Sequence, residues 1–116
     1  MSNRYQTKQL QELDALHHLH PMTNHQSLRS GAIRVIVKGD GPYIWDSEGN
    51  RILDGMAGLW TTNIGYGRKE MAEAAYAQMV ELPFYNTFFR TTHPQAVLLA
   101  RKLAEIAPSN LNQVFF

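Results

Sequence analysis

The sequence contains no cysteine, no long apolar run and no excess of charge of one sign. Without cysteine there are no disulfides and no thiolate metal ligands, which fits a cytoplasmic protein. No apolar stretch approaches the roughly 18 residues of a membrane span, and the polar Met1–Gln11 lacks a signal-peptide core. Eleven Lys and Arg against ten Asp and Glu, with interspersed signs, argue against a nucleic-acid or anionic-membrane surface. We therefore expect a soluble, cytoplasmic protein.

The first predicted elements are one helix and a polar loop. Lys8–His18 carries apolar residues near helical spacing, Thr7 can cap its N-terminus, and Pro21 is expected to end it. Residues 22–30 are polar and show no period, which predicts a loop. One helix followed by irregular chain is therefore expected before the first strand.

Three runs of strand-forming residues predict a small antiparallel meander. The first run, Ile33–Val37, leads to a glycine turn at residues 39–41. Tyr43–Trp45 and Arg51–Leu53 follow, and Ser47–Asn50 between them has the composition of a hairpin turn. Three short strands with tight connections make a sheet with neighbouring strands in chain order.

Helical spacing returns after the meander and predicts two further helices. The first is expected to begin near Arg68 and to end before Pro83, because proline cannot continue a helix. The second is expected to have Pro94 at its first position and to run to Ala107. Residues 114–116, Val-Phe-Phe, are then typical of an apolar strand.

The segment after the third strand is an unusual loop. Asp54–Gly58 is too rich in glycine to extend a strand, and it leaves Leu59 and Trp60 in irregular backbone. A ring as large as an indole is usually buried, so Trp60 either fills the core or lines a pocket. The residues alone leave both interpretations open.

An aromatic cluster follows Pro83. Phe84–Phe89 holds four aromatic side chains in six residues, with neither strand alternation nor helical spacing. Because monomers rarely expose large apolar patches, part of this segment is expected to be buried by a partner subunit. Packing in the chain's own core is the alternative interpretation.

Five histidines raise the question of a metal site. Two of them have the i,i+3 spacing that brings side chains together on one helical face. No third ligand is placed by spacing, and no outer hydrogen-bond partner is indicated, so we expect no metal site. The spaced pair is His17 and His20, and the others are His18, His25 and His93.

Gly65-Tyr66-Gly67 precedes a predicted helix, where free N–H groups can bind an anion. The segment lacks the Gly-Lys-Ser/Thr of a P-loop and the third glycine of the dinucleotide fingerprint. A plain turn is the preferred interpretation, because paired glycines mostly serve backbone angles that other residues avoid.

Five segments, in this order along the chain, resemble the N-terminal part of class III aminotransferases dependent on pyridoxal 5′-phosphate (PLP). They are His17–Pro21, Trp45–Asn50, Asp54–Trp60, Gly65–Gly67 and Leu82–Phe89. The resemblance is to the omega-transaminase group and covers residues 17–116. It implies an α/β fold, fold type I of the PLP-dependent transferases. In that fold a small-domain β-meander leads into helices and the first strand of the large domain.

The same resemblance implies an activity and a set of pocket residues. In the family, an amino group passes from an amine or omega-amino acid to a ketoacid such as pyruvate through a PLP aldimine. By resemblance, Met22, Leu59 and Trp60 line the substrate pocket, and Phe88 and Phe89 reach the pocket of the partner subunit in a homodimer. Relatives commonly carry an aromatic residue at the position of Met22, whose flexible thioether would soften that side of the pocket.

The resemblance places the catalytic lysine and the phosphate-binding turn beyond Phe116. No lysine of this chain lies in a matching segment, so we expect no catalytic and no cofactor-binding residue here, and no activity from the 116 residues alone. The lysines are Lys8, Lys38, Lys69 and Lys102.

Three parts are expected along the chain: an N-terminal helix with its following loop at 1–25, the meander at 26–62, and the start of the cofactor-binding domain at 63–116. The alternative to an enzyme is a small non-catalytic module that dimerises through Phe84–Phe89 and binds no cofactor. The absence of the family's lysine favours this alternative. A nucleic-acid-binding protein is excluded by the balanced charge.

Overall fold

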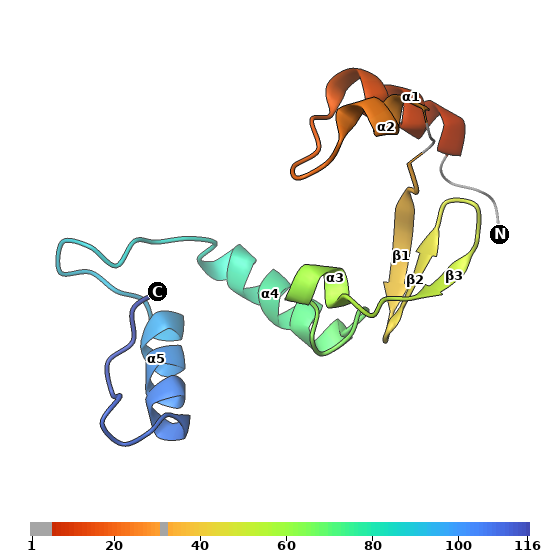
Figure 1. The fold of residues 1–116 in the computed structure, drawn as a ribbon. Coiled ribbons are helices and arrows are strands. Elements are labelled where there is room, and N and C mark those ends of the chain that lie inside the picture. The colour runs from red at the N-terminus through yellow and green to blue at the C-terminus, as the bar shows by residue number, and fades with distance from the viewer. Residues whose placement is uncertain (1–5, 31–32) are drawn as a thin grey trace. The chain divides into compact units, whose positions relative to one another are not determined.

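The computed structural model describes residues 6–30 and 33–116 (Figure 1). The chain forms two compact units, Met1–Lys69 and Glu70–Phe116, and each is described by itself. The expected part boundaries at 25/26 and 62/63 stay predictions, because compact units of this chain do not define the domains of a longer protein.

Helix α1 (Thr7–His17) begins as predicted but is not capped as predicted. Gln6 occupies the N-cap without a side-chain hydrogen bond, and the Thr7 hydroxyl instead donates to Ser47 Oγ at 2.8 Å. The cap expected from Thr7 is therefore wrong, because this hydroxyl ties the helix to the hairpin turn. The helix ends at His17, since His18 has extended backbone ahead of Pro21.

The loop predicted for residues 22–30 is wrong in its second half, where helix α2 (His25–Ser30) forms. Asn24 starts this helix: its Oδ1 accepts hydrogen bonds from the N–H groups of Gln26 at 3.0 Å and Ser27 at 3.4 Å. Asparagine is among the strongest N-caps. The sequence signal was present at Asn24, but six residues are too few to show helical periodicity.

The predicted meander is confirmed as a sheet of β1 (Ile36–Asp40), β2 (Tyr43–Asp46) and β3 (Arg51–Leu53), in that order and antiparallel (Figure 1). The first strand begins three residues later than the expected Ile33 and continues through Gly39 and Asp40, so the turn expected at residues 39–41 is wrong at its first two positions. The β1–β2 register shifts between Ile36 and Lys38. Strand propensity therefore located the sheet, but it did not fix the ends of its first strand.

Asp46 closes the hairpin turn between β2 and β3. Its carboxylate, 4% exposed, accepts hydrogen bonds from the backbone N–H groups of Glu48 at 3.0 Å and Asn50 at 2.9 Å, and from Asn50 Nδ2 at 2.9 Å. The Asn50 side chain and these backbone donors hold the pKa of Asp46 below its ordinary value. The turn predicted from composition is thus fixed by one carboxylate.

Helices α4 (Lys69–Glu81) and α5 (Pro94–Ile106) are confirmed at nearly their predicted bounds. Pro94 begins α5 behind His93, whose Nδ1 accepts a hydrogen bond from Ala96 N at 3.4 Å. The strand expected at residues 114–116 is wrong, since these residues have no regular structure. A strand needs a neighbour to satisfy its backbone groups, and no described residue pairs with this segment.

Among the described residues no apolar side chain is fully buried. Exposed large apolar residues occur in both units, including Tyr76 and Val80 on α4 and Leu98 on α5. No helix in the described part of the chain is long and apolar enough to cross a membrane. The apolar helix faces therefore lack the partner layers that cover such faces in α/β folds.

Candidate functional site

All five residues predicted to line a substrate pocket have exposed side chains. Met22, Leu59 and Trp60 belong to the first unit, whereas Phe88 and Phe89 belong to the second. Trp60 is 77% exposed, so its ring is not packed in the core of this chain. The structure joins the five residues only as two adjacent pairs, at 59–60 and 88–89, and it leaves their assembly into one pocket a prediction.

Positive φ angles concentrate at these same residues. In the described ranges only six residues other than glycine have positive φ, and four of them are predicted pocket residues. Such backbone is uncommon outside glycine, and strain of this kind clusters at ligand sites. The six are Met22, Ala57, Leu59, Trp60, Phe89 and Arg90.

The loop that carries Trp60 is a left-handed turn, α3 (Ala57–Trp60). Its φ angles are 49° at Ala57, 60° at Gly58, 67° at Leu59 and 63° at Trp60. Left-handed helical backbone costs about 1–2 kcal/mol for each residue other than glycine. The irregular backbone expected at Leu59 and Trp60 is thus present, in a form that needs compensation from surrounding contacts.

Asp54 supplies much of that compensation. Its Oδ2 accepts a hydrogen bond from Gly58 N at 2.8 Å, inside the left-handed turn, and its Oδ1 accepts one from Met56 N at 3.2 Å. Tyr66 donates its hydroxyl to the same Oδ2 at 2.6 Å. Sequence reasoning missed this pair, because no local spacing links residues 54 and 66.

The two side chains change each other's acidity. The Tyr66 hydroxyl, together with backbone donors, holds the pKa of Asp54 below its ordinary value. Conversely, the Asp54 carboxylate raises the pKa of Tyr66. Both shifts keep the carboxylate ionised and the phenol neutral at neutral pH, so the carboxylate accepts a hydrogen bond from the phenol.

Phe88 and Phe89 present their rings from a second strained turn. The ring centroids lie 6.2 Å apart at 57°. Asn86 Oδ1 accepts a hydrogen bond from Phe88 N at 2.9 Å, and the Thr91 hydroxyl donates to Phe88 O at 2.6 Å. Phe88 also borders an apolar hollow of about 410 Å³ beside α5, whose lining includes Leu99. The aromatic cluster is thus ordered locally while its rings stay uncovered.

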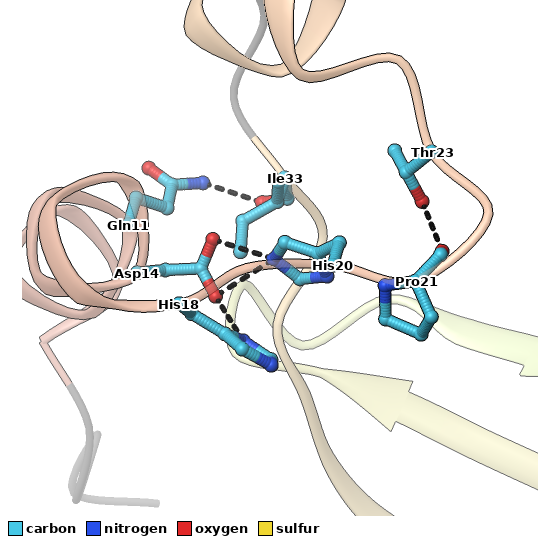
Figure 2. Close-up of polar contacts among 7 residues, drawn as sticks. All are labelled: Gln11, Asp14, His18, His20, Pro21, Thr23 and Ile33. Atoms are coloured by element: carbon cyan, nitrogen blue, oxygen red, sulfur yellow. Dashed lines mark hydrogen bonds and ion pairs between the residues drawn. The ribbon is translucent and has the colours of Figure 1, made fainter.

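The histidine-rich segment forms a polar cluster around Asp14, which sequence reasoning did not include (Figure 2). Asp14 Oδ1 lies 2.9 Å from His18 Nδ1, and its Oδ2 lies 2.8 Å from His20 Nε2. His17, the expected partner of His20, is replaced by His18 because α1 ends at residue 17. The i,i+4 spacing of Asp14 and His18 was a signal for this contact.

The cluster has the dimensions of a hydrogen-bonded group. The candidate ligand atoms of Asp14, His18 and His20 lie within 4.8 Å of one another. Their closest pairs, at 2.8–3.0 Å, are shorter than the roughly 3.3 Å edge of a tetrahedral zinc site with 2.0–2.1 Å bonds. His20, as first partner, and then His18 hold the pKa of Asp14 below its ordinary value. The expectation of no metal site stays a prediction.

This cluster anchors the segment that carries Met22. Asp14 holds His20, and the Thr23 hydroxyl donates to Pro21 O at 2.8 Å on the other side of Met22 (Figure 2). Met22 itself has φ 51° and a fully exposed side chain. The predicted pocket residue is therefore presented by a turn fixed at both flanks.

Gly65-Tyr66-Gly67 has the backbone of a turn, as preferred from the sequence. Gly65 has φ 85° and Gly67 φ 73°, and Gly65 N donates to Thr62 O at 3.0 Å. Tyr66 pairs with Gly41, with N···O distances of 3.1 and 2.9 Å. The backbone N–H groups of Gly65 and Tyr66 are thus already engaged within the chain.

The lysines with described contacts are engaged elsewhere. Lys38 Nζ lies 4.5 Å from the centroid of the Trp45 ring, and Lys102 Nζ lies 3.8 Å from Glu105 Oε2. These contacts do not test the expectation that no lysine of this chain is catalytic, which stays a prediction.

The sequence model of the family described as aminotransferase class-III matches residues 25–116. Putrescine–pyruvate aminotransferase of Pseudomonas aeruginosa is 54% identical over 110 residues, which are 95% of this chain and 24% of that protein. The chain therefore belongs to the class III aminotransferases. It spans about a quarter of the length of this relative.

Solved structures agree with this family. A thermostable (S)-enantioselective omega-transaminase from Thermomicrobium roseum matches with a TM-score of 0.91 and 47% identity, over 94% of this chain and 24% of that one. A thermostable omega transaminase variant with a tryptophan replaced by glycine, engineered for asymmetric synthesis of enantiopure bulky amines, matches with a TM-score of 0.82 and 35% identity, over 85% and 22%. The chain thus has the fold of a segment of these transaminases, and the predicted fold class is confirmed.

Proposed function

We propose that the protein containing this chain is a PLP-dependent transaminase that moves an amino group from an amine or omega-amino acid to a ketoacid such as pyruvate. Membership of the class III aminotransferases supports this reaction. The amine and the acceptor are supported by the name of the Pseudomonas aeruginosa relative, a putrescine–pyruvate aminotransferase. The proposal includes a cytoplasmic homodimer.

The observation that carries the proposal is the strained backbone at the predicted pocket residues. Met22, Leu59, Trp60 and Phe89 adopt positive φ, although nothing in their side chains favours such angles. Their apolar side chains stay exposed at the same time. Strain together with exposure is expected where a chain presents side chains to a ligand or a partner.

In this function the chain supplies pocket walls. Leu59 and Trp60 lie beside the substrate, Met22 closes one flank, and Phe88 and Phe89 extend across the dimer to the partner's pocket. Apolar walls exclude water and discriminate amine substituents by size, at roughly 1–3 kcal/mol per methylene. Substrate selection is therefore the contribution of this segment.

The cofactor is held by other parts of the protein. PLP supplies the electron sink for the amino transfer, and the chemistry needs a free lysine and a phosphate cradle. The resemblance places both beyond Phe116, and within this chain Lys38 and Lys102 have other partners and the turn at 65–67 pairs with Gly41. The proposal therefore assigns the cofactor contacts to residues outside this chain.

The proposal is tested on the full-length protein loaded with PLP. Pyruvate is offered with putrescine, a monoamine and an omega-amino acid in turn, and alanine formation is measured. We expect alanine to form with at least one donor. We also expect Trp60→Ala to change the relative rates with the different donors. A folded, PLP-treated protein that forms alanine with no donor would favour the non-catalytic dimerising module.

A further inference from the structure

We propose that Asp54 and Tyr66 are positioning residues for substrate selection, because together they set the left-handed turn that presents Trp60. This inference rests on the proposed function. The amine selectivity that the indole provides then depends on this hydrogen-bonded pair. The hydrogen-bonded pair of Asp54 and Tyr66 is called the Asp54–Tyr66 brace.

The left-handed turn at residues 57–60 requires support from other contacts. Ala57, Leu59 and Trp60 all have left-handed φ, and a run of such residues lies higher in energy than ordinary turn backbone. With an exposed indole, the ring's own packing contributes little to holding this conformation. The hydrogen bonds beneath the turn must therefore select it.

The Asp54 carboxylate accepts hydrogen bonds from both the turn and Tyr66. Asp54 Oδ2 accepts from Gly58 N at 2.8 Å and from the Tyr66 hydroxyl at 2.6 Å. Bonds to an ionised acceptor are stronger than neutral ones. Since Gly58 lies between Ala57 and Leu59 in the turn, a displacement of the carboxylate moves the backbone that orients Trp60.

Tyr66 is fixed to the sheet by its ring and by its backbone. A Cβ atom at Gly39 would lie 2.5 Å from Tyr66 Cγ, so the ring rests directly on the β1 backbone. The backbone of Tyr66 also exchanges two hydrogen bonds with Gly41. The position of the sheet therefore fixes the Tyr66 hydroxyl, which holds Asp54 in place, and Asp54 in turn holds Gly58 N in the turn.

The turn leaves little room for an alternative arrangement. A Cβ atom at Gly58 would lie 2.9 Å from the Tyr66 hydroxyl and 3.1 Å from Thr62 Oγ1. The Thr61 hydroxyl meanwhile donates to Gly58 O at 2.8 Å. Gly58 is therefore closely surrounded by Tyr66, Thr61 and Thr62. The contacts of Gly58 thus restrict the backbone that orients Trp60.

The principal test is Tyr66→Phe in the full-length enzyme. This change removes the hydroxyl and keeps the ring that rests on Gly39. We expect the ratio of kcat/KM for a bulky amine to that for a small amine to change about tenfold, the effect of one hydrogen bond to a charged group. Tyr76→Phe, an exposed Tyr on α4, is the matched control and should leave the ratio unchanged.

A double-mutant cycle shows whether Tyr66 acts through the indole. In a Trp60→Ala background, Tyr66→Phe should no longer change the amine ratio, because the ring being positioned is gone. An unchanged ratio in the single variant, or an equal change in both backgrounds, would overturn the inference. If the wild-type enzyme forms no alanine at all, the proposed function fails instead.

A second measurement does not depend on activity. With 5-fluorotryptophan incorporated, the ¹⁹F resonance of Trp60 is assigned as the one lost in Trp60→Phe. Tyr66→Phe and Gly39→Ala, which displaces the ring from behind, should both shift or broaden this resonance, whereas the resonance of Trp45 should keep its position. A Trp60 resonance that is unaffected by both variants would refute a positioning role.

Discussion

At the residue scale, Trp60 combines an exposed indole with left-handed backbone. It is 77% exposed at the end of a left-handed turn. We expect Trp60→Ala in the full-length enzyme to favour bulkier amines and to weaken small aromatic ones. Its melting temperature should fall only slightly, whereas loss of a core tryptophan costs about 3–5 kcal/mol.

Trp45→Ala is the matched control for this prediction. Trp45 is partly buried in β2 beneath Lys38, so its loss should lower the melting temperature and leave amine preference unchanged. A large fall in the melting temperature of Trp60→Ala, with unchanged relative rates across the amines, would show that Trp60 packs in the core instead of lining the pocket.

Asp14 carries a second prediction at this scale. Since its pKa is held below the ordinary 3.8 by the bond to His20, the ionised carboxylate stabilises the fold. This contribution is present above pH 3.8 and is lost as the pH falls through the lower folded-state value. Melting temperatures of the wild type should exceed those of Asp14→Asn above that range and converge with them below it.

Glu12→Gln, an exposed change on the same helix, is the control for Asp14 and should follow the wild type across the titration. A difference between wild type and Asp14→Asn that is the same at every pH would contradict an ionic origin.

At the element scale, helix α2 depends on a single cap. It has six residues, fewer than an isolated helix needs. The Asn24 side chain accepts hydrogen bonds from Gln26 N and Ser27 N at its start, and Ser27 N also donates to Asn24 O at 3.1 Å. Asn24→Ala should cost about 1 kcal/mol and speed amide exchange at Gln26 and Ser27. Asn24→Asp keeps an acceptor oxygen and should preserve the protection. Equal exchange in all three proteins would show that Asn24 does not hold the helix.

The helices and strands also differ in how well their local sequence predicted them. α4 and α5 have the length and spacing for a helix to be read from thirteen residues, and the hairpin has its turn chemistry within five residues of Asp46. The start of β1 was misplaced because β-branched residues extend beyond the pairing. The strand at 114–116 was wrong because strand formation depends on a neighbour, which the local sequence does not contain.

At the scale of the whole molecule, the uncovered apolar faces predict that the 116 residues alone are weakly folded. None of the described apolar side chains is fully buried, so hydrophobic burial contributes little to stability. Hydrogen exchange of the isolated chain should show protection mainly in the β1–β2–β3 sheet.

Treatment of the isolated 116 residues with PLP and borohydride should give no lysine adduct at a single site. Such an adduct would show that this chain holds the catalytic lysine.

The homodimer is a further whole-molecule prediction. If Phe88 and Phe89 wall the partner's pocket, a subunit without the catalytic lysine should rescue a subunit with Phe88→Ala and Phe89→Ala. The lysine-bearing site of that heterodimer receives intact rings only across the interface. Alanine formation should recover toward one active site per heterodimer. No recovery in heterodimers that have demonstrably formed would mean that the rings serve their own subunit.

The sequence by itself determined the family, the meander and the main helices, because these follow from motifs, spacing and turn residues that are local in the chain. It also named Trp60 and Phe89 as pocket candidates, although it left core packing open for both. Only the tertiary structure decided that these residues are strained and exposed. It alone paired Asp54 with Tyr66 and placed Tyr66 on Gly39. These contacts join residues 12 to 27 positions apart in the sequence. They form only when the folded sheet brings the segments that carry Gly39, Asp54 and Tyr66 together.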